Sequence, residues 1–490
     1  MKKIISFFFI LVLSCGVFAQ TKIDSIGLNK LKGGLKAMSV DADLVHANWG
    51  FCLMDPTTGK VLAEYGSEKS LTPASSQKVI TTIAAMNILG ADYTYKTYVE
   101  YTGTIGKDSV LTGDLYIRGT GDPTLGSMRI DSLVTYDSLL EVWALKIKEK
   151  GIATINGKII ADASYFEDYT TVGSWNWDDI GQYYGAGASG LNFAENKYTV
   201  YFSSNASRAK IDSIRPEIDG MTVWNDVRVG GTGDEAYIYG APDNYYRYVT
   251  GTIPANRKAY EVDGSMPDPP LFLALALKSA LDTIGIHVTG QATTQYAVVR
   301  AGLADKSERK ALFTHSSVPL KQMIFETNQH SINLYAETFL KTIGKKQKND
   351  GSREAGVNAE NAFYSTAGLK LDAMHIEDGS GLSRLNYFSP KDMCSILRFE
   401  MQQNSFTDFL PTLPVAGQSG TLKTMGDNTA AEGRIFAKSG SMYKVRSYSG
   451  YVQTKSGQKL VFCVMVNNYT CGSAEIRAKL EKLMVLMAGV

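Results

Sequence analysis

A serine and a lysine three positions apart, Ser75 and Lys78, offer the clearest chemistry in this sequence. Residues 79–89, which follow directly, are apolar on nearly every face, and this predicts a buried helix that starts near Pro73 and ends at Gly90. One turn of such a helix brings the hydroxyl and the amine together. Because burial disfavours the charged amine, Ser75 beside Lys78 is a candidate for an activated nucleophile.

The spacing alone is weak evidence, because Ser-x-x-Lys occurs four more times in the chain. These pairs are Ser207/Lys210, Ser307/Lys310, Ser441/Lys444 and Ser456/Lys459. For an arbitrary match, a solvated pair is the expected outcome. Ser75 differs by its setting, since it follows Pro73 and opens a strongly hydrophobic helix in which an ammonium group is costly.

The N-terminal residues have the pattern of a secretory signal peptide. Lys2 and Lys3 precede a short apolar run, and the small residues before Gln20 predict cleavage after Ala19, which removes residues 1–19. No later stretch approaches the roughly 18 apolar residues that a membrane span requires. We therefore expect an exported, periplasmic protein with no transmembrane segment in its mature chain.

The composition is that of a globular protein of about two or three domains, because 44% of its 490 residues are hydrophobic and 20% are charged. Removal of the signal peptide changes the formal net charge from +1 to −1, so the mature chain lacks the excess of positive charge that is typical of nucleic-acid-binding proteins. Cysteines remain at positions 52, 394, 463 and 471, too few for a disulfide framework. We expect no nucleic-acid partner, and the disulfide status of the cysteines stays open.

The order of strands and helices predicts an α+β, multidomain protein with one discontinuous domain, residues 20–92 and 263–490. Two strands within residues 48–65 precede the buried helix, and the C-terminal part contains helices, three strands and a final helix. Strands from the two ends of the chain can pair into one antiparallel sheet flanked by helices. Residues 93–262 are rich in Tyr, Val, Ile and Thr and are punctuated by Gly and Asp, which predicts a β-rich insertion of two subdomains.

Two later stretches supply the polar groups that a Ser/Lys nucleophile needs. Ser331 and Asn333 lie at the start of a predicted helix, where such residues also serve as ordinary caps. Lys438, Ser439 and Gly440 follow one another on a predicted strand, where a lysine is also common as a solvated edge residue. Taken singly, each stretch has a structural explanation, but their order after the first motif favours a shared site.

In this order the three motifs resemble those of penicillin-binding proteins and serine β-lactamases. Within that superfamily the chain resembles the class C low-molecular-mass penicillin-binding proteins of the PBP4/DacB type, the D-alanyl-D-alanine carboxypeptidase/endopeptidase family also called peptidase family S13. Supporting features are residues 73–75, 333–337, 378–384 and 413–417 and the long insertion after the first motif. One departure is Ser439, where the family usually has threonine, although the hydroxyl is retained.

The resemblance implies a serine D,D-peptidase whose partners are peptidoglycan stem peptides. Ser75 attacks the carbonyl of a terminal D-Ala-D-Ala peptide and forms an acyl-enzyme, while Lys78, kept partly neutral by burial and by the positive Lys438, takes the proton. Ser331 relays that proton toward the leaving amine, and Asn333 holds the lysine and the substrate amide. β-Lactam antibiotics are expected to acylate the same serine, and neither a cofactor nor a metal is implied.

The same resemblance assigns residues to substrate binding. Lys438 and Ser439, followed by Gly440, bind the terminal carboxylate. The backbone N–H groups of Ser75 and Ser441 form the oxyanion hole. The family's insertion helps to read the diamino-acid side chain of the stem peptide, and the residues assigned to that side chain are Asp178, Arg384, Trp175 and Tyr183. Core packing is the alternative explanation for the last two.

Other classes of hydrolase fit less well. None of the five histidines lies in a recognisable Ser-His-Asp motif, and no pair has the HExxH spacing of a zinc enzyme. A β-lactamase shares the three motifs but lacks such an insertion. The alternative that stays open is a catalytically inactive peptidoglycan-binding or β-lactam-sensing protein. The oligomeric state and the balance between carboxypeptidase and endopeptidase action also stay open.

Overall fold

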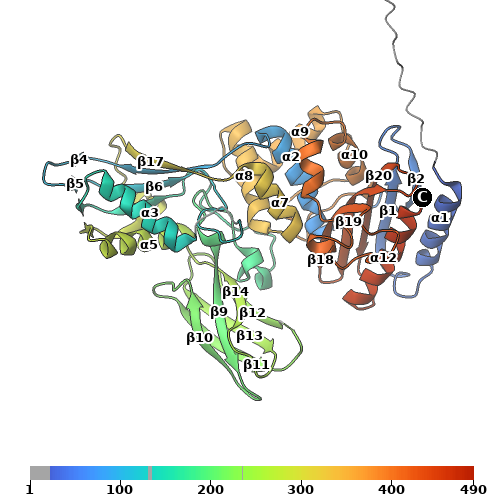
Figure 1. The fold of residues 1–490 in the computed structure, drawn as a ribbon, viewed down its shortest axis with the longest axis horizontal. Helices are drawn as coiled ribbons and strands as arrows, with labels where there is room; N and C mark the ends of the chain where they lie inside the picture. The colour runs from blue at the N-terminus through green and yellow to red at the C-terminus, as the bar shows by residue number, and fades with distance from the viewer. Residues whose placement is uncertain (1–22, 131–134, 234) are drawn as a thin grey trace, which may run out of the picture.

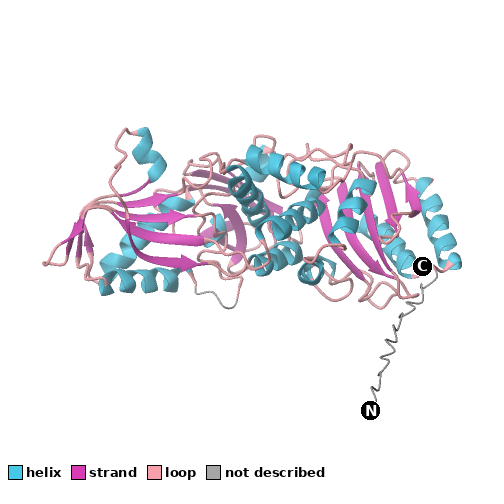
Figure 2. Cartoon of the chain, turned by 90° about the horizontal axis from the view of Figure 1, so that it is seen from above, coloured by secondary structure: helices cyan, strands magenta, loops and turns pink. Residues whose placement is uncertain are grey.

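The computed structural model describes residues 23–490, except for residues 131–134 and 234. The predicted cleavage site after Ala19 lies outside the described residues. The described chain forms a sheet flanked by helices, which contains both ends of the chain, and a β-rich insertion beside it (Figures 1 and 2). Over the part of the chain that is described, no helix combines the length and apolarity needed to cross a membrane.

A five-stranded antiparallel sheet joins the two ends of the chain, as the sequence predicted. The order of its strands is β18-β19-β20-β1-β2. Their bounds are β1 (Asn48–Met54), β2 (Val61–Tyr65), β18 (Ile435–Met442), β19 (Val445–Gln453) and β20 (Lys459–Asn467). Pairing of β1 with β20 runs from Asn48 opposite Asn467 to Met54 opposite Val461, so it closes one sheet across the whole length of the chain.

Helices cover both faces of this sheet. Successive side chains of a strand point to opposite faces, and the apolar residues of the strands on each face pack against helices. The helices α1 (Ser25–Ser39) and α12 (Ser473–Ala488) lie beside the sheet (Figure 1). Phe51 and Leu53 pack with them on one face. Cys52 packs on the other face against a group of helices. These are α2 (Lys78–Leu89), α7 (Leu320–His330), α8 (Asn333–Lys348), α9 (Arg353–Thr366), α10 (Pro390–Glu400) and α11 (Phe406–Phe409), with the 3₁₀ turn η4 (Leu410–Thr412). The 3₁₀ turn η1 (Ala74–Gln77) leads into α2, and Leu422 of the 3₁₀ turn η5 (Gly420–Leu422) packs with Phe51 and Leu53.

The insertion has two lobes. The first contains sheets of order β16-β8-β6-β3-β17 and β15-β7-β5-β4. Its elements are β3 (Lys96–Tyr101), β4 (Thr104–Ile105), β5 (Val110–Thr112), β6 (Leu115–Gly119), β7 (Thr154–Asn156), β8 (Ile159–Asp162), β15 (His287–Val288), β16 (Ala292–Thr294), β17 (Lys310–Ser316), α3 (Tyr136–Glu149), α5 (Pro269–Thr283) and α6 (Gln295–Arg300).

The second lobe projects downward in Figure 1 and consists of sheets of order β10-β9-β14 and β11-β13-β12. Its strands are β9 (Lys197–Ser204), β10 (Ala209–Arg215), β11 (Thr222–Val229), β12 (Glu235–Tyr239), β13 (Tyr246–Ile253) and β14 (Tyr260–Ser265). Three short turns, α4 (Trp177–Ile180), η2 (Tyr183–Gly185) and η3 (Ala194–Asn196), lie between this lobe and the helices beside the five-stranded sheet.

The insertion extends further along the chain than residue 262, where the sequence analysis ended it. Strand β15 pairs with β7, β16 with β8, and β17 with β3. Residues 263–316 therefore join the sheets of the insertion, and we call residues 23–92 and 317–490 the main domain. The sequence placed this segment wrongly because its helical periodicity resembles that of the main domain, and only long-range strand pairing assigns it.

The helix that carries the first motif differs from the prediction at its start. The sequence predicts helix from Pro73, whereas the structure has the 3₁₀ turn η1 first and α2 only from Lys78. Side chains at i and i+3 eclipse in a 3₁₀ turn, so Ser75 and Lys78 still meet. The helix ends at Gly90, whose φ of 91° suits glycine, and residues 78–86 are all buried as expected.

Candidate active site

Lys78 lies at the centre of a buried group of polar atoms. Its Nζ is 2.9 Å from Oγ of Ser75, 2.6 Å from Oδ1 of Asn333 and 2.7 Å from the carbonyl oxygen of Ser380. The lysine side chain is fully buried. These three oxygens, from three separate segments of the main domain, hold the amine in one position beside the hydroxyl.

Burial lowers the pKa of Lys78 from 10.5 to about 7, against the opposing effect of the Asp378 and Glu337 carboxylates. An amine with this pKa is substantially neutral near pH 7, and so has a lone pair that can accept the Ser75 proton. The sequence analysis attributed part of this neutrality to the positive charge of Lys438. The structure instead gives burial as its cause.

Lys438 forms a second buried contact across the site. Its Nζ is 2.9 Å from Oγ of Ser331 and 2.7 Å from the carbonyl oxygen of Ser439. Burial and the charge of Lys78 hold the pKa of Lys438 well below its usual value. Each lysine of the site therefore lies next to a serine hydroxyl from which a proton can be taken or to which one can be given.

Ser331 occupies a strained turn between α7 and α8. Its φ of 60° and ψ of 41° are left-handed, which costs a non-glycine residue about 1 to 2 kcal/mol. Strain of this kind is common at functional sites, where the surrounding structure maintains it. The turn directs the Ser331 hydroxyl to Lys438, and Asn333, two residues later at the start of α8, faces Lys78.

The third motif packs directly on the turn that carries the nucleophile. A Cβ on Gly440 would lie 2.4 Å from the carbonyl oxygen of Pro73 and 2.9 Å from the backbone nitrogen of Ser76. Only glycine allows β18 to approach η1 this closely. Ser439, beside it, places its Oγ 2.7 Å from Oγ1 of Thr421.

A loop of the main domain supplies the Ser380 carbonyl, and two buried carboxylates shape it. Asp378 accepts hydrogen bonds from the backbone N–H groups of residues 381 and 383 and from the Asn386 side chain. Glu337 accepts them from the N–H groups of residues 379 and 380, at 3.2 and 2.8 Å. Burial raises the pKa of Glu337 to about 7. This network fixes the loop against Lys78.

Trp175 reaches the same loop from the insertion. Its Nε1 donates to Oδ2 of Asp378 at 2.8 Å, and the side chain is almost fully buried. The sequence analysis assigned Trp175 to a substrate side chain, but it is absent from the described residues that line the cavity. The geometry makes Trp175 a support for the loop, because its only polar atom is used inside the protein.

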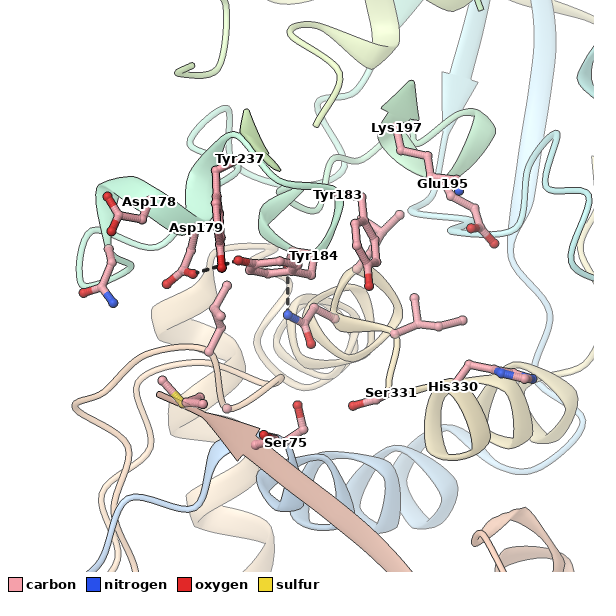
Figure 3. Close-up of a pocket in the computed structure, with 18 of the residues that line it drawn as sticks. Ser75, Asp178, Asp179, Tyr183, Tyr184, Glu195, Lys197, Tyr237, His330 and Ser331 are labelled. Carbon is pink, nitrogen blue, oxygen red and sulfur yellow. Dashed lines mark hydrogen bonds between the residues drawn. The ribbon is translucent and has the colours of Figure 1, made fainter. Parts of the chain in front are cut away.

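A cavity of about 730 Å³ lies between the main domain and the insertion (Figure 3). The predicted residues that line it are Ser75, Ser331, Asn333, Arg384 and Ser441 from the main domain and Asp178 and Tyr183 from the insertion. Met442 and Tyr443 also line it. A groove of about 880 Å³ shares Ser75 and Ser331 and continues past Ser439. Lys78, Lys438 and Gly440 lie beneath these surfaces.

The sequence analysis missed one contact between the insertion and the second motif. Nδ2 of Asn333 donates to the carbonyl oxygen of Tyr184 at 2.7 Å, while the Tyr184 hydroxyl donates to Oδ1 of Asp179 at 3.2 Å (Figure 3). This contact fixes the amide so that its Oδ1 faces Lys78. No sequence signal marks it, because the acceptor is a backbone atom in an irregular turn.

Neither a metal site nor a disulfide is found among the residues that the structure describes. No group of three or more His, Cys, Asp or Glu side chains in this part of the chain is placed to hold a metal ion. The cysteines at positions 52, 394, 463 and 471 are buried free thiols.

This site, on an antiparallel sheet flanked by helices, defines a serine enzyme with the penicillin-binding and β-lactamase type of fold. The chain belongs to the D-Ala-D-Ala carboxypeptidase 3 (S13) family, whose model matches residues 31–489. It is therefore a serine-type peptidase of that family. The family and the fold predicted from the three motifs are confirmed.

Known relatives match nearly the whole chain. The D-alanyl-D-alanine carboxypeptidase DacB of Haemophilus influenzae is 25% identical over 446 residues, 89% of this chain and 89% of that protein. The D-alanyl-D-alanine carboxypeptidase of Actinomadura sp. strain R39 is 28% identical over 472 residues, 92% of this chain and 83% of that protein. The crystal structure of penicillin binding protein 4 (dacB) from Haemophilus influenzae has a TM-score of 0.79 at 22% identity and covers 94% of this chain and 99% of that one, so the fold is shared.

Proposed function

We propose that the protein is an exported D,D-peptidase that acts on peptidoglycan stem peptides through an acyl-enzyme on Ser75. It removes the terminal D-Ala from D-Ala-D-Ala ends, cleaves cross-links between D-Ala and a diamino acid, or does both. The observation that carries the proposal is the distance of 2.9 Å between Oγ of Ser75 and Nζ of a fully buried Lys78 whose pKa is about 7. The names of the two curated relatives support the substrate class.

In the proposed reaction, the neutral amine of Lys78 takes the hydroxyl proton as Oγ of Ser75 attacks the carbonyl carbon. Backbone N–H groups of Ser75 and Ser441 stabilise the negative oxygen of the tetrahedral intermediate. The C–N bond then breaks, and the leaving amine receives its proton through Ser331. Water hydrolyses the ester, which releases the shortened peptide and restores the hydroxyl.

Substrate orientation follows from the two sides of the nucleophile. The hydroxyl of Ser439, which Thr421 already holds, contacts the terminal carboxylate on the leaving-group side. The buried amine of Lys438 supports this subsite from beneath, through the carbonyl oxygen of Ser439. On the opposite side the stem peptide enters the cavity, where Asp178, Tyr183 and Arg384 face the diamino-acid side chain. A carboxylate and a guanidinium suit the amine and the carboxylate that such a side chain carries.

The test is intact-mass spectrometry of the mature protein after incubation with benzylpenicillin. We expect a single penicilloyl adduct on the wild type and on Ser307→Ala, the control, whose serine belongs to an exposed Ser-x-x-Lys pair. Ser75→Ala should give no adduct. A parallel assay of D-alanine release from a D-Ala-D-Ala peptide tests the peptidase step. A wild type that forms no adduct and releases no D-alanine would instead favour the inactive binding or sensing protein.

A further inference from the structure

One small sheet of the insertion carries an unusual set of exposed aromatic side chains. In the sheet β11-β13-β12, Trp224 is 72% exposed, Tyr246 75%, Tyr237 45% and Tyr248 40%. A single exposed aromatic residue is ordinary, but a concentration of them on one surface marks a site of interaction. Together with Tyr239, these residues are called the aromatic face.

The strand register places all five side chains on the same side of the sheet. Trp224 lies opposite Tyr248, and Tyr248 lies opposite Tyr239, which makes one row across the three strands. Directly opposed residues point to the same face. Tyr246 and Tyr237 lie two positions from members of that row, so they share its face. The ring centroids of Tyr239 and Tyr248 are 6.2 Å apart.

The aromatic rings are not part of the hydrophobic core of the lobe. The alternate positions of the same strands are buried on the opposite face of the sheet, and they include Val227, Ala236, Ile238, Arg247 and Val249. Burial of that face alone stabilises a half-exposed sheet, whose outer face is normally polar. Packing of the core therefore does not explain why the outer face of this sheet is aromatic.

Polar groups lie between the rings of the aromatic face. Thr222 lies opposite Tyr246, and Thr250 lies opposite Tyr237. The Tyr248 hydroxyl donates to Oδ2 of Asp226 at 2.9 Å. Flat apolar rings edged by hydroxyl and carboxylate groups suit a saccharide, since a sugar presents C–H groups on its faces and hydroxyl and amide groups around its edge.

The aromatic face is continuous with the cavity that contains Ser75. Tyr237 and Tyr239 line that cavity together with Asp178, and Figure 3 shows the ring of Tyr237 beside Asp179 and Tyr184. From Tyr239 the row crosses two strand spacings, about 10 Å, to reach Trp224. A molecule with one end in the cavity can therefore continue along the row without leaving the protein surface.

We propose that the aromatic face binds the glycan strand from which the substrate stem peptide projects, a polysaccharide of N-acetylated sugars. This inference rests on the proposed function. A stem peptide is joined to the glycan at its N-terminal end, and its C-terminal end lies at Ser75. The peptide must therefore leave the cavity on the acyl side, where Asp178 and the first rings of the aromatic face lie.

The experiment measures binding of peptide-free glycan strands, from which the stem peptides have been removed, by isothermal titration. We expect Trp224→Ala to weaken binding about tenfold, because a stacked Trp ring provides a large contact area. Tyr246→Ser, at the same face, should weaken binding as well. Tyr169→Ala is the matched control, since this residue of the insertion is 62% exposed and lies outside the aromatic face.

Acylation by benzylpenicillin, a ligand without a sugar, reports on Ser75 in every variant. Wild-type protein that is acylated but binds no glycan overturns the inference and leaves the proposed function standing. Protein that binds glycan with the expected variant pattern but is never acylated overturns the proposed function alone. Equal loss of glycan binding in Trp224→Ala and Tyr169→Ala overturns the inference, and so does a change of oligomeric state in Trp224→Ala, which would make the face a contact between copies of the chain.

Discussion

The two walls of the cavity differ in how far their polar groups are buried and hydrogen-bonded. Directly beneath the main-domain wall, Lys78 and Lys438 are completely buried, and each amine lies within 3 Å of two or more oxygens. On the insertion wall, Tyr183 is 52% exposed and Asp178 is exposed to solvent. The first wall is fixed before any ligand arrives, whereas the second leaves its groups open. We expect the first to set the rate of chemistry with every ligand and the second to set preference among ligands.

The comparison is tested most severely by Lys78→Ala. If the buried amine is the base, the second-order rate of acylation by benzylpenicillin should fall at least about a thousandfold. Because truncation of a buried side chain can also disturb the fold, the melting temperature is measured alongside, and Lys78→Met provides a variant of closer volume. Lys310→Ala, from an exposed Ser-x-x-Lys pair, should acylate at the wild-type rate. A loss below tenfold would assign the proton transfer to another group.

The pH dependence of acylation should report the same amine. With a pKa of about 7, Lys78 is charged below that pH and cannot accept a proton. The acylation rate should therefore fall about tenfold for each pH unit below 7 and level off above it. A rate that still climbs tenfold per unit between pH 8 and 9 would mean that burial shifts the lysine far less than the structure indicates.

Trp175 belongs to the insertion in sequence but supports the buried wall. Trp175→Phe removes the hydrogen bond to Asp378, so we expect the loop at Ser380 to loosen and acylation by benzylpenicillin to slow about fivefold. Stability to urea should also decrease. The exposed Trp177 is the control, and Trp177→Phe should change neither property. If Trp175→Phe changed only the KM for a stem peptide, Trp175 would be the substrate contact that the sequence suggested.

The contrast between the walls also explains which parts of the fold and of the site could be predicted from the sequence. Ser75, Lys78 and Lys438 are polar residues within apolar segments, and it is this setting, together with the order of the three motifs along the chain, that distinguishes them from the other Ser-x-x-Lys pairs. The end of the insertion could not be found in this way, because residues 310–316 join β3 only through pairing across some 210 positions of chain. The sequence singled out Trp175 as a contact of the substrate, but it gave no sign of the hydrogen bond from Trp175 to Asp378.

The exposed aromatic side chains of the insertion are harder still to predict from the sequence. Tyr237 and Tyr239 alternate along one strand, as do Tyr246 and Tyr248 along another, and each pattern by itself fits an ordinary half-buried strand. Only the register between the strands shows that the four rings share one outward face. The carbonyl of Tyr184 gives no signal at all, since any residue supplies that atom. The sequence thus predicts the buried polar groups of the main domain better than the exposed groups of the insertion.

The smallest effect is expected at Asp178, and it separates the walls most directly. Asp178→Asn should raise the KM for a stem peptide with a free side-chain amine about threefold, because an exposed ion pair contributes little. Neither the kcat for that peptide nor the rate of acylation by benzylpenicillin should change. The same peptide with its side-chain amine acetylated should bind wild type and variant equally, and Asp219→Asn serves as an exposed control in the insertion. A fall in kcat or in the acylation rate would show that the insertion wall acts on the chemistry itself, and the division between the two walls would then be wrong.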